Sequence, residues 1–174
     1  LLRVDAGATA ALRALGADAD ATLFMTLLAA WYVLLHRFTG QRDLVVGLPV
    51  RNVPEGLDGV MGYFVNVLPL RMRLDPSMPF STLVSQVRAA VLDCFSHPDM
   101  PLDRLVRELD LPRDASRSPV YQAMFSYQDI RERSGQWGDL RYGHVMLPQH
   151  TANQDIALWC FEDHDGLEAD LNYS

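Results

Sequence analysis

This sequence contains only two cysteines, and they are far apart. Neither Cys94 nor Cys160 has a second cysteine or a histidine at the spacing of a metal site. This pattern indicates neither a disulfide framework nor a metal centre, and we expect no metal ligands. Both thiols are predicted to be reduced and buried, as in a cytosolic protein.

Long apolar runs and a secretion signal are also missing. The most apolar window, residues 21–35, is too short to span a bilayer and is followed by His36 and Arg37. The first residues are apolar and then acidic, without a basic start or a small-residue cleavage site. We therefore expect a cytoplasmic protein that does not enter a membrane, and we assign the apolar window to a core helix.

Positive charge is in the minority. The chain has 15 basic and 22 acidic residues, a formal net charge of −7 and a sequence pI of about 5.1. Such a balance argues against nucleic acid and anionic membranes as partners. An acidic carrier protein could bind only through a local basic patch, which the net charge of the whole chain does not reveal. The length of 174 residues and the 49% apolar content fit one domain with a sizeable core.

Helical and strand patterns alternate along the chain. Helices are predicted at 6–15, ended by Gly16, at 22–38, capped by Asp18 or Asp20, at 82–95, capped by Ser77 or Ser81, and at 102–109. Strands are predicted at 1–4, 43–50, 63–74, 120–127, 144–147, 156–161 and 167–173. This order predicts an α/β layer fold with a mixed sheet and an antiparallel edge.

Three strand details follow from side-chain alternation and turn chemistry. Leu70, Met72 and Leu74 are expected on one face of their strand, and Tyr121, Ala123, Phe125 and Tyr127 on one face of theirs. Pro49 places the end of its strand at a sheet edge or against a loop. The turn 164–166 contains Asp-Gly, which favours a hairpin between the last two strands.

Residues 129–143 are a long polar excursion for a compact domain. Trp137, Leu140 and Tyr142 are its sizeable apolar anchors, too few to order the segment by its own contacts. We expect the excursion to be functional or to pack on something outside these residues.

One asparagine interrupts an apolar run. Asn66 lies between Tyr63 and Leu68, in a stretch predicted to be a buried strand. An amide without partners costs a few kcal/mol in such a place. Asn66 is therefore either a core residue with its hydrogen bonds satisfied, a residue with a dedicated hydrogen-bonding role, or one that faces a polar cavity.

Several stretches together resemble a known family. Residues 62–67 (GYFVNV) resemble the G-x-F-V-N-T motif of the condensation domains of non-ribosomal peptide synthetases, with Val67 in place of threonine. Residues 97–103 (HPDMPLD) resemble H-Q-D-x-P-F-E, departing from it at three positions, and residues 113–125 resemble R-D-x-S-R-x-P-x-F-x-x-M-F. Residues 22–47 are similar to the helix and strand that precede these motifs. The resemblance implies a chloramphenicol-acetyltransferase-like lobe, a mixed sheet flanked by helices.

The family's catalytic motif, H-H-x-x-x-D-G, is not found among the five histidines. In the family it belongs to the N-terminal half, so the resemblance implies that residues 1–174 are the C-terminal lobe alone, with no catalytic residue of its own. The excursion at 129–143 would correspond to the latch that crosses to the other lobe.

The resemblance implies amide formation by the intact domain, an acyltransferase of peptide natural product biosynthesis. The substrates would be carried on phosphopantetheine arms, with no cofactor bound directly. Partners would be the N-terminal lobe, the upstream and downstream peptidyl carrier domains and an adjoining adenylation domain. Three alternatives stay open. The first is a catalytically silent module of the same fold that recruits a partner enzyme. The second is an epimerisation domain, although residues 64–67 argue against it, and a weaker third is a terpenoid or polyketide acyltransferase of the superfamily.

Site residues follow from the motif positions. Asn66 corresponds to an asparagine that faces the tunnel, and Arg51 to an arginine that pairs with the aspartate of the missing motif, unless it is a solvated loop residue. Gly62, Phe64 and Pro101 are further motif positions. His97 with Asp99 is better explained as a helix C-terminal cap than as a catalytic dyad. Ser118 with Gln122 is expected to fix the entry of a loop into its strand rather than to bind substrate, and Pro119 is another motif position.

Overall fold

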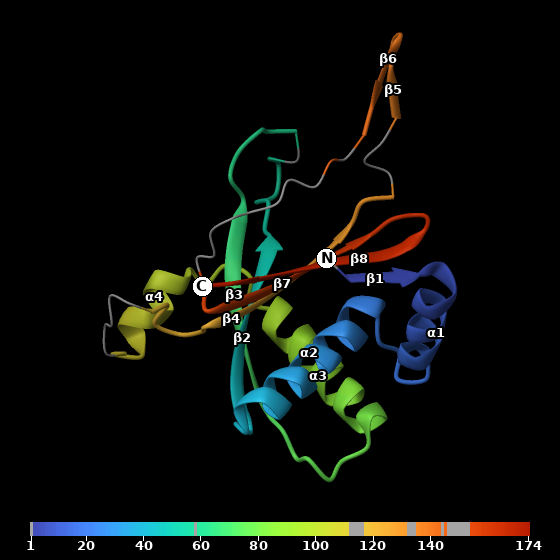
Figure 1. Ribbon diagram of the computed structural model, residues 1–174. Coiled ribbons are helices and arrows are strands. Elements are labelled where there is room, and N and C mark those ends of the chain that lie inside the picture. The colour runs from blue at the N-terminus through green and yellow to red at the C-terminus, as the bar shows by residue number, and fades with distance from the viewer. Residues whose placement is uncertain (1, 58, 112–116, 132–134, 144, 146–153) are drawn as a thin grey trace.

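A computed structural model describes residues 2–57, 59–111, 117–131, 135–143, 145 and 154–174. Six strands within these ranges form one sheet in the order β1-β8-β7-β4-β2-β3 (Figure 1). Their bounds are β1 Leu2–Asp5, β8 Gly166–Tyr173, β7 Ile156–Glu162, β4 Ala123–Asp129, β2 Asp43–Arg51 and β3 Val65–Arg73.

The sheet is parallel at its centre and antiparallel at its flanks. β4 runs parallel to both of its neighbours, β2 and β7. β3 pairs antiparallel with β2 on one side, and β8 and β1 continue antiparallel on the other. The α/β fold with a mixed sheet and antiparallel edges, predicted from the alternation of patterns, is confirmed.

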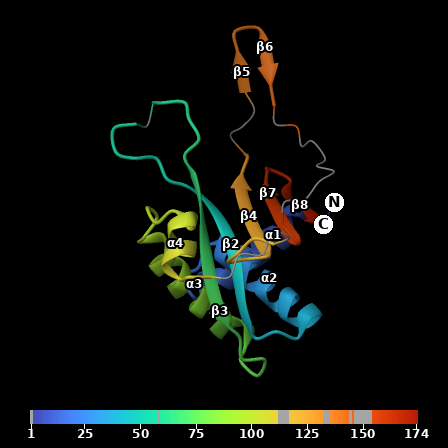
Figure 2. The ribbon, with the colours of Figure 1, turned by 90° about the vertical axis from the view of Figure 1, so that its left-hand side faces the viewer.

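Three helices cover one face of this sheet (Figures 1 and 2): α1 Ala6–Ala17, α2 Leu23–Thr39 and α3 Phe80–Phe95. The deepest is α2, because Leu28, Trp31 and Tyr32 are fully buried. The Tyr32 hydroxyl donates a 2.7 Å hydrogen bond to the Leu70 carbonyl, which fastens α2 to β3. The main core therefore lies between α2, α3 and the central strands. None of the helices in the described ranges is long and apolar enough to cross a membrane.

The cap of α2 differs from the prediction. The Thr22 hydroxyl accepts the Met25 amide at 3.3 Å, so Thr22 is the N-cap. Asp18 instead follows the last residue of α1 as its C-cap, and Asp20 has a φ of 52° in the tight connection between the two helices. Both aspartates belong to that connection, and the prediction that one of them caps α2 was wrong.

The start of α3 was also predicted wrongly. Its first helical residue follows Pro79, whose side chain makes no capping hydrogen bond, so neither Ser77 nor Ser81 is the cap. Ser77 is bound to Asp75 instead, which accepts both its amide at 2.9 Å and its hydroxyl at 2.7 Å. Pro79 is the N-cap residue in an extended conformation, and its carbonyl accepts the amides of Thr82 and Leu83 in the first turn.

Glycine ends α2 but not α1. Gly40 has a φ of 71° and its amide donates to the His36 carbonyl, the usual C-terminal arrangement. Gly16, predicted as the end of α1, lies inside the helix and is buried. A Cβ there would lie 2.4 Å from the Thr26 hydroxyl, so Gly16 serves the close packing of α1 against α2.

β3 starts later than predicted. Pairing with β2 begins at Val65, and Tyr63, two residues earlier, is 87% exposed. The buried strand predicted from residue 63 was therefore wrong at its start, because the aromatic run there belongs to a loop. From Leu70 onwards the predicted alternation is confirmed, with Leu70, Met72 and Leu74 buried and Arg71 and Arg73 exposed.

β4 also begins later than predicted. Tyr121 precedes it and packs on the other face from Ala123 and Phe125, so the four-residue face predicted for this strand was wrong at its first member. The pairing of β2 with β4 is confined to Val46 and Gly47. Pro49 thus lies beyond this ladder, where its missing amide hydrogen costs no bond to β4.

The last two strands form the predicted hairpin. Asp163 Oδ1 accepts the amides of Asp165 and Gly166 in the turn. Gly166 has a φ of 135°, and a Cβ there would lie 2.2 Å from the Val4 carbonyl oxygen of β1. The strand predicted at 144–147 lies outside the described residues, apart from Val145.

Two segments project from the same end of the sheet (Figures 1 and 2). One is the loop 52–64 between β2 and β3. The other, within the excursion, is a two-stranded hairpin of β5 Gly135–Trp137 and β6 Leu140–Tyr142. Both expose large apolar side chains, namely Val60, Met61 and Tyr63 on the loop and Trp137, Leu140 and Tyr142 on the hairpin.

Candidate functional site

The face of the sheet opposite the three helices is hollowed. A cavity of about 680 Å³ lies there, lined along β3, β4 and β7 by Val67, Met124, Ala157 and Trp159. The fourth helix, α4 Leu102–Glu108, packs beside it through Leu102. Side chains alternate across a strand, so these residues are the ones that point away from the core. The rest of the lining is polar or lies at the rim: Pro49, Val50, Arg51, Gly62, Tyr63, Phe64, Val65, Tyr121, Ser126, Tyr127, Gln128, Gln154 and Asn172.

A glycine makes room for an aromatic side chain in this cavity. A Cβ on Gly47 would lie 2.6 Å from the Tyr121 ring. Burial raises the pKa of Tyr121, against the opposing effect of its hydrogen bond with Ser118, so the hydroxyl stays neutral. The Gln122 amide donates to the Ser118 carbonyl at 2.9 Å, and the exposed Pro119 lies in the turn between them. This turn sets where Tyr121 enters the cavity wall.

Asn66 holds a neighbouring loop. Its side-chain nitrogen donates to the Pro98 carbonyl at 3.0 Å and to the Met100 carbonyl at 2.9 Å, and its side-chain oxygen accepts the Val67 amide at 3.0 Å. The amide group is thus satisfied by the protein, and Asn66 lines neither this cavity nor a smaller one that opens towards the helices. Its contribution in this structure is the position of residues 97–101.

The same loop has a second attachment. The Asn52 side-chain nitrogen donates to Asp99 Oδ1 at 2.7 Å. His97 is exposed, and its backbone amide donates to the Cys94 carbonyl at the end of α3. Pro101 is the residue from which α4 begins. The two asparagines therefore tie the connection between α3 and α4 to the end of the β2–β3 hairpin.

Arg51 lies at the rim where the two cavities meet. It is exposed at the end of β2 and lines both. Behind it the hairpin continues for one more hydrogen bond, from the Asn52 amide to the Phe64 carbonyl at 2.8 Å. Phe64 is half-buried, and a Cβ on Gly62 would lie 3.0 Å from its ring. Gly62 and Phe64 thus shape the rim together.

The second cavity, of about 490 Å³, opens towards the helices. Its wall includes three phenylalanines from α2, α3 and β4: the Phe24 ring lies 6.1 Å from Phe95 and 5.7 Å from Phe125. Tyr127 at the end of β4 lines both cavities. The first cavity is therefore partly polar and the second mainly apolar. They share Arg51 and Tyr127 at the end of the sheet from which the loop and hairpin project.

The residues that line the two cavities shape and contact what enters. The described residues that line the two cavities include no histidine, cysteine, aspartate or glutamate. In the described ranges no group of three or more such residues could hold a metal ion. Cys94 is half-buried and Cys160 buried, both are free thiols, and burial raises the pKa of each. What the site offers is apolar contact, neutral hydrogen-bonding groups and one guanidinium.

Sequence reasoning did not assign a role to Asn52, Tyr127 or Glu162. Asn52 contacts a residue 47 positions away, and no local pattern reports such a contact. Glu162 was recognisable in principle, because it is a carboxylate directly after the apolar run 156–161. Two of the histidines among which the catalytic motif was sought, His144 and His150, lie outside the described residues.

Comparison with known proteins identifies the family. The family model described as "Condensation domain" matches residues 1–174. This chain belongs to the condensation domain family. It is 39% identical to surfactin synthase subunit 1 of Bacillus subtilis (strain 168) over 99% of its own length, and 36% identical to tyrocidine synthase 3 of Brevibacillus parabrevis over 93%. It spans only 5% and 2% of these two relatives.

Solved structures agree with this family. The condensation domain from Monacolin K polyketide synthase MokA superimposes with a TM-score of 0.86 at 28% identity, covering 99% of this chain and 41% of that one. The X-domain from teicoplanin biosynthesis superimposes with a TM-score of 0.83 at 30% identity, covering 99% and 40%. In both comparisons the chain corresponds to less than half of a solved domain.

Proposed function

We propose that this chain is the C-terminal lobe of a condensation domain in a non-ribosomal peptide synthetase, and that the intact domain forms amide bonds. The observation that carries the proposal is the match of all 174 residues to the family, together with the coverage of 41% of a solved condensation domain. A lobe of this kind supplies one wall of the reaction chamber. The N-terminal lobe, with the catalytic histidine, would supply the other.

The proposed reaction joins two carrier-bound substrates. The amine of an aminoacyl thioester on the downstream carrier attacks the carbonyl carbon of an acyl thioester on the upstream carrier. A C–N bond forms, the C–S bond breaks, the thiol remains on the upstream phosphopantetheine arm and the amine loses a proton. Positioning of the two reactants supplies a large part of such a rate enhancement. The two cavities on either side of the end of β2 are suited to hold the two reacting arms apart until they meet.

In this proposal Arg51 and Asn66 support the chamber. Arg51, exposed at the rim, would pair with the aspartate of the motif on the other lobe. Asn66 would act indirectly, because its side-chain amide holds the loop 97–101 in position. The upstream and downstream peptidyl carrier domains and an adenylation domain are the proposed partners, and the cytoplasm the proposed location.

The projecting hairpin is proposed to be the latch that crosses to the N-terminal lobe. Trp137, Leu140 and Tyr142 are between 54% and 80% exposed, which is unusual for side chains of this size. The loop 52–64 exposes similar side chains at the same end of the sheet (Figure 2). One partner surface would cover both.

The test is product formation. The synthetase segment containing both lobes is incubated with an upstream and a downstream carrier, each loaded with an amino acid. Mass spectrometry then detects the dipeptidyl thioester on the downstream carrier. We expect product from the two-lobe domain and none above background from residues 1–174 alone. A folded two-lobe domain that binds both carriers without product would favour the silent recruitment module instead.

A further inference from the structure

A buried carboxylate lies behind the wall shared by the two cavities. Among the described residues, Glu162 is the one acidic side chain that is buried, with 4% exposure. It is the last residue of β7 and points to the helix-covered side of the sheet, next to the end of β4. A charge in such a place is stable only if it is paired and hydrogen-bonded.

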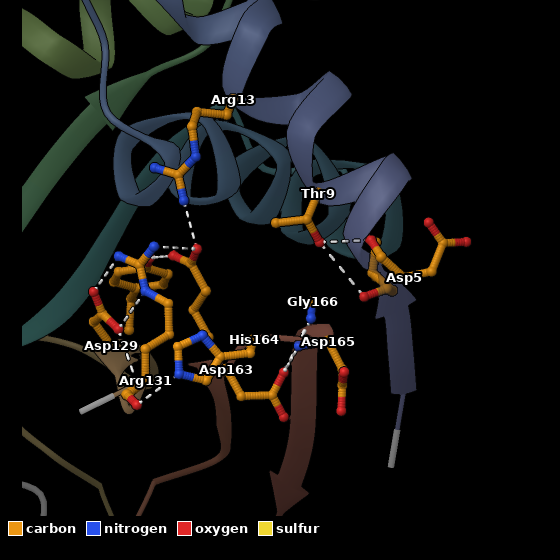
Figure 3. A network of polar contacts seen from close by, with 12 residues as sticks. Asp5, Thr9, Arg13, Asp129, Arg131, Asp163, His164, Asp165 and Gly166 are labelled. Carbon is orange, nitrogen blue, oxygen red and sulfur yellow. Dashed lines mark hydrogen bonds and ion pairs between the residues drawn. The ribbon is translucent and has the colours of Figure 1, made fainter. Parts of the chain in front are cut away.

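Three donors from three parts of the chain reach this carboxylate. Arg13 of α1 donates to Oε1 at 2.5 Å, Arg131 approaches Oε1 at 3.5 Å, and the Tyr127 hydroxyl donates to Oε2. Figure 3 shows Arg13 reaching down from above and Arg131 lying next to Asp129. Burial, followed by the contact with Glu162, raises the pKa of Tyr127, so its hydroxyl stays protonated and donates.

Arg131 is itself held by several contacts, although its side chain is 41% exposed. It forms a two-point ion pair with Asp129, which lowers the pKa of that carboxyl to about 2. Its backbone carbonyl is hydrogen-bonded to His164 Nε2 at 3.0 Å, and the backbone continues the β4–β7 ladder through the Ile130 amide and the Glu162 carbonyl (Figure 3). The two arginines and two carboxylates balance in charge. Arg131 is also the last described residue before β5, within the excursion 129–143.

The cluster therefore joins two functional parts of the lobe. Tyr127 lines both cavities, and Arg131 stands at the root of the projecting hairpin. We propose that Glu162 is a positioning residue that fixes, through Tyr127, the wall between the two substrate cavities and, through Arg131, the direction in which the hairpin leaves the sheet. This inference rests on the proposed condensation function, because it takes the cavities as substrate sites and the hairpin as the latch.

The experiment compares Glu162→Gln with the matched control Glu168→Gln in the two-lobe domain. Glu168 lies opposite Phe161 in the adjacent strand and forms an ion pair with Arg3, whose side chain is 79% exposed. Two readouts are taken: kcat and KM for carrier-bound substrates, and amide hydrogen exchange of residues 135–142. For Glu162→Gln we expect kcat/KM to fall about tenfold or more, since small misplacements cost this much, and the hairpin to exchange faster. Glu168→Gln should change neither.

Two further variants separate the effect of Glu162 on the cavity wall from its effect on the hairpin. Tyr127→Phe removes only the hydroxyl and should lower kcat/KM while the hairpin exchange stays near that of the parent. Arg131→Met should accelerate hairpin exchange and raise KM more than it lowers kcat. These variants also serve if Glu162→Gln does not fold. Folded variants with parental kinetics and parental exchange would overturn the inference.

Failure of the proposed function looks different. If the parent domain forms no amide with any loaded carrier, the condensation proposal fails while the exchange arm still tests the anchoring of the hairpin. If the parent is active and Tyr127→Phe and Arg131→Met both behave as the parent, the proposed function stands and the positioning role of Glu162 is wrong.

Discussion

The two faces of the sheet are built from alternate residues of the same strands and differ in what they are made of. On the helix-covered face, Val46 and Phe125 are completely buried among apolar side chains. On the other face, the neighbouring positions of β4 are Met124 and Ser126, and the wall also contains Gln128. The larger apolar core lies on the first face, whereas the second combines a smaller apolar cluster with polar groups and open volume. The contrast teaches that a single strand can pack the core with one side and line an open cavity with the other.

The largest expected effect comes from removing a core side chain on the helix-covered face. Phe125→Ala should cost ~3–5 kcal/mol of unfolding free energy, because it removes a fully buried ring from the core. Met124→Ala, one position away but facing the open cavity, should cost about 2 kcal/mol, at the low end for such a truncation. Urea unfolding monitored by circular dichroism measures both. Equal losses of unfolding free energy for the two variants would contradict the conclusion that the helix-covered face contributes more packing stability.

A smaller effect is expected from filling the open face. Gly47→Ala places a Cβ 2.6 Å from the Tyr121 ring, which must move, at a cost of ~1–3 kcal/mol typical of overpacking. Gly59→Ala is the control, because no atom lies within 4 Å of the place its methyl group would take. The same urea titration distinguishes them. Rescue of Gly47→Ala by Tyr121→Leu would sharpen the assignment, and an unchanged Gly47→Ala would refute it.

The hydrogen bonds of Asn66 should stabilise mainly the loop 97–101 and its surroundings. Asn66→Ala removes three hydrogen bonds and should cost about 1–3 kcal/mol while leaving the fold intact. Asn52→Ala, which loses one exposed contact to Asp99, should cost less. Hydrogen exchange of residues 102–108 should accelerate more in Asn66→Ala than in Asn52→Ala. We also expect Asn66→Ala to weaken condensation by the intact domain, and parental exchange in α4 would remove the basis for that expectation.

Much of this contrast between the faces was visible in the sequence. The alternation at Leu70, Met72 and Leu74 predicted the buried face of β3 correctly, and the Asp-Gly turn predicted the last hairpin. Periodicity succeeds there because burial repeats along one element. It failed at Tyr63, which is apolar but exposed, because an aromatic run on a projecting loop has the same composition as a buried strand.

The site was less predictable than the fold. The contacts of Asn66 with Pro98 and Met100 join residues more than 30 positions apart, and the motif resemblance marked both stretches without revealing that they touch. The helix caps failed for a related reason: Asp20 is a good cap by composition, but the packing of Gly16 against α2 fixes a connection in which Thr22 is the residue at the helix start. Tertiary contacts decide such positions.

The smallest expected effect is at the far end of the open face, where Asp43 pairs with Arg71 at 2.7 Å and Arg73 at 3.2 Å. The hydrogen bond from Arg71, with a smaller one from Arg73, lowers the pKa of Asp43 from 3.8 to about 2. A carboxyl whose pKa is lower in the folded state stabilises the fold above its unfolded pKa, and this contribution disappears as the pH falls through the folded pKa. The parent should therefore exceed Asp43→Asn slightly in urea midpoint at pH 6, with the difference shrinking between pH 4 and pH 2. The pair is exposed, so added salt should also reduce the difference. Parallel midpoints for the two proteins from pH 6 downwards would show that this ion pair contributes nothing to the open face.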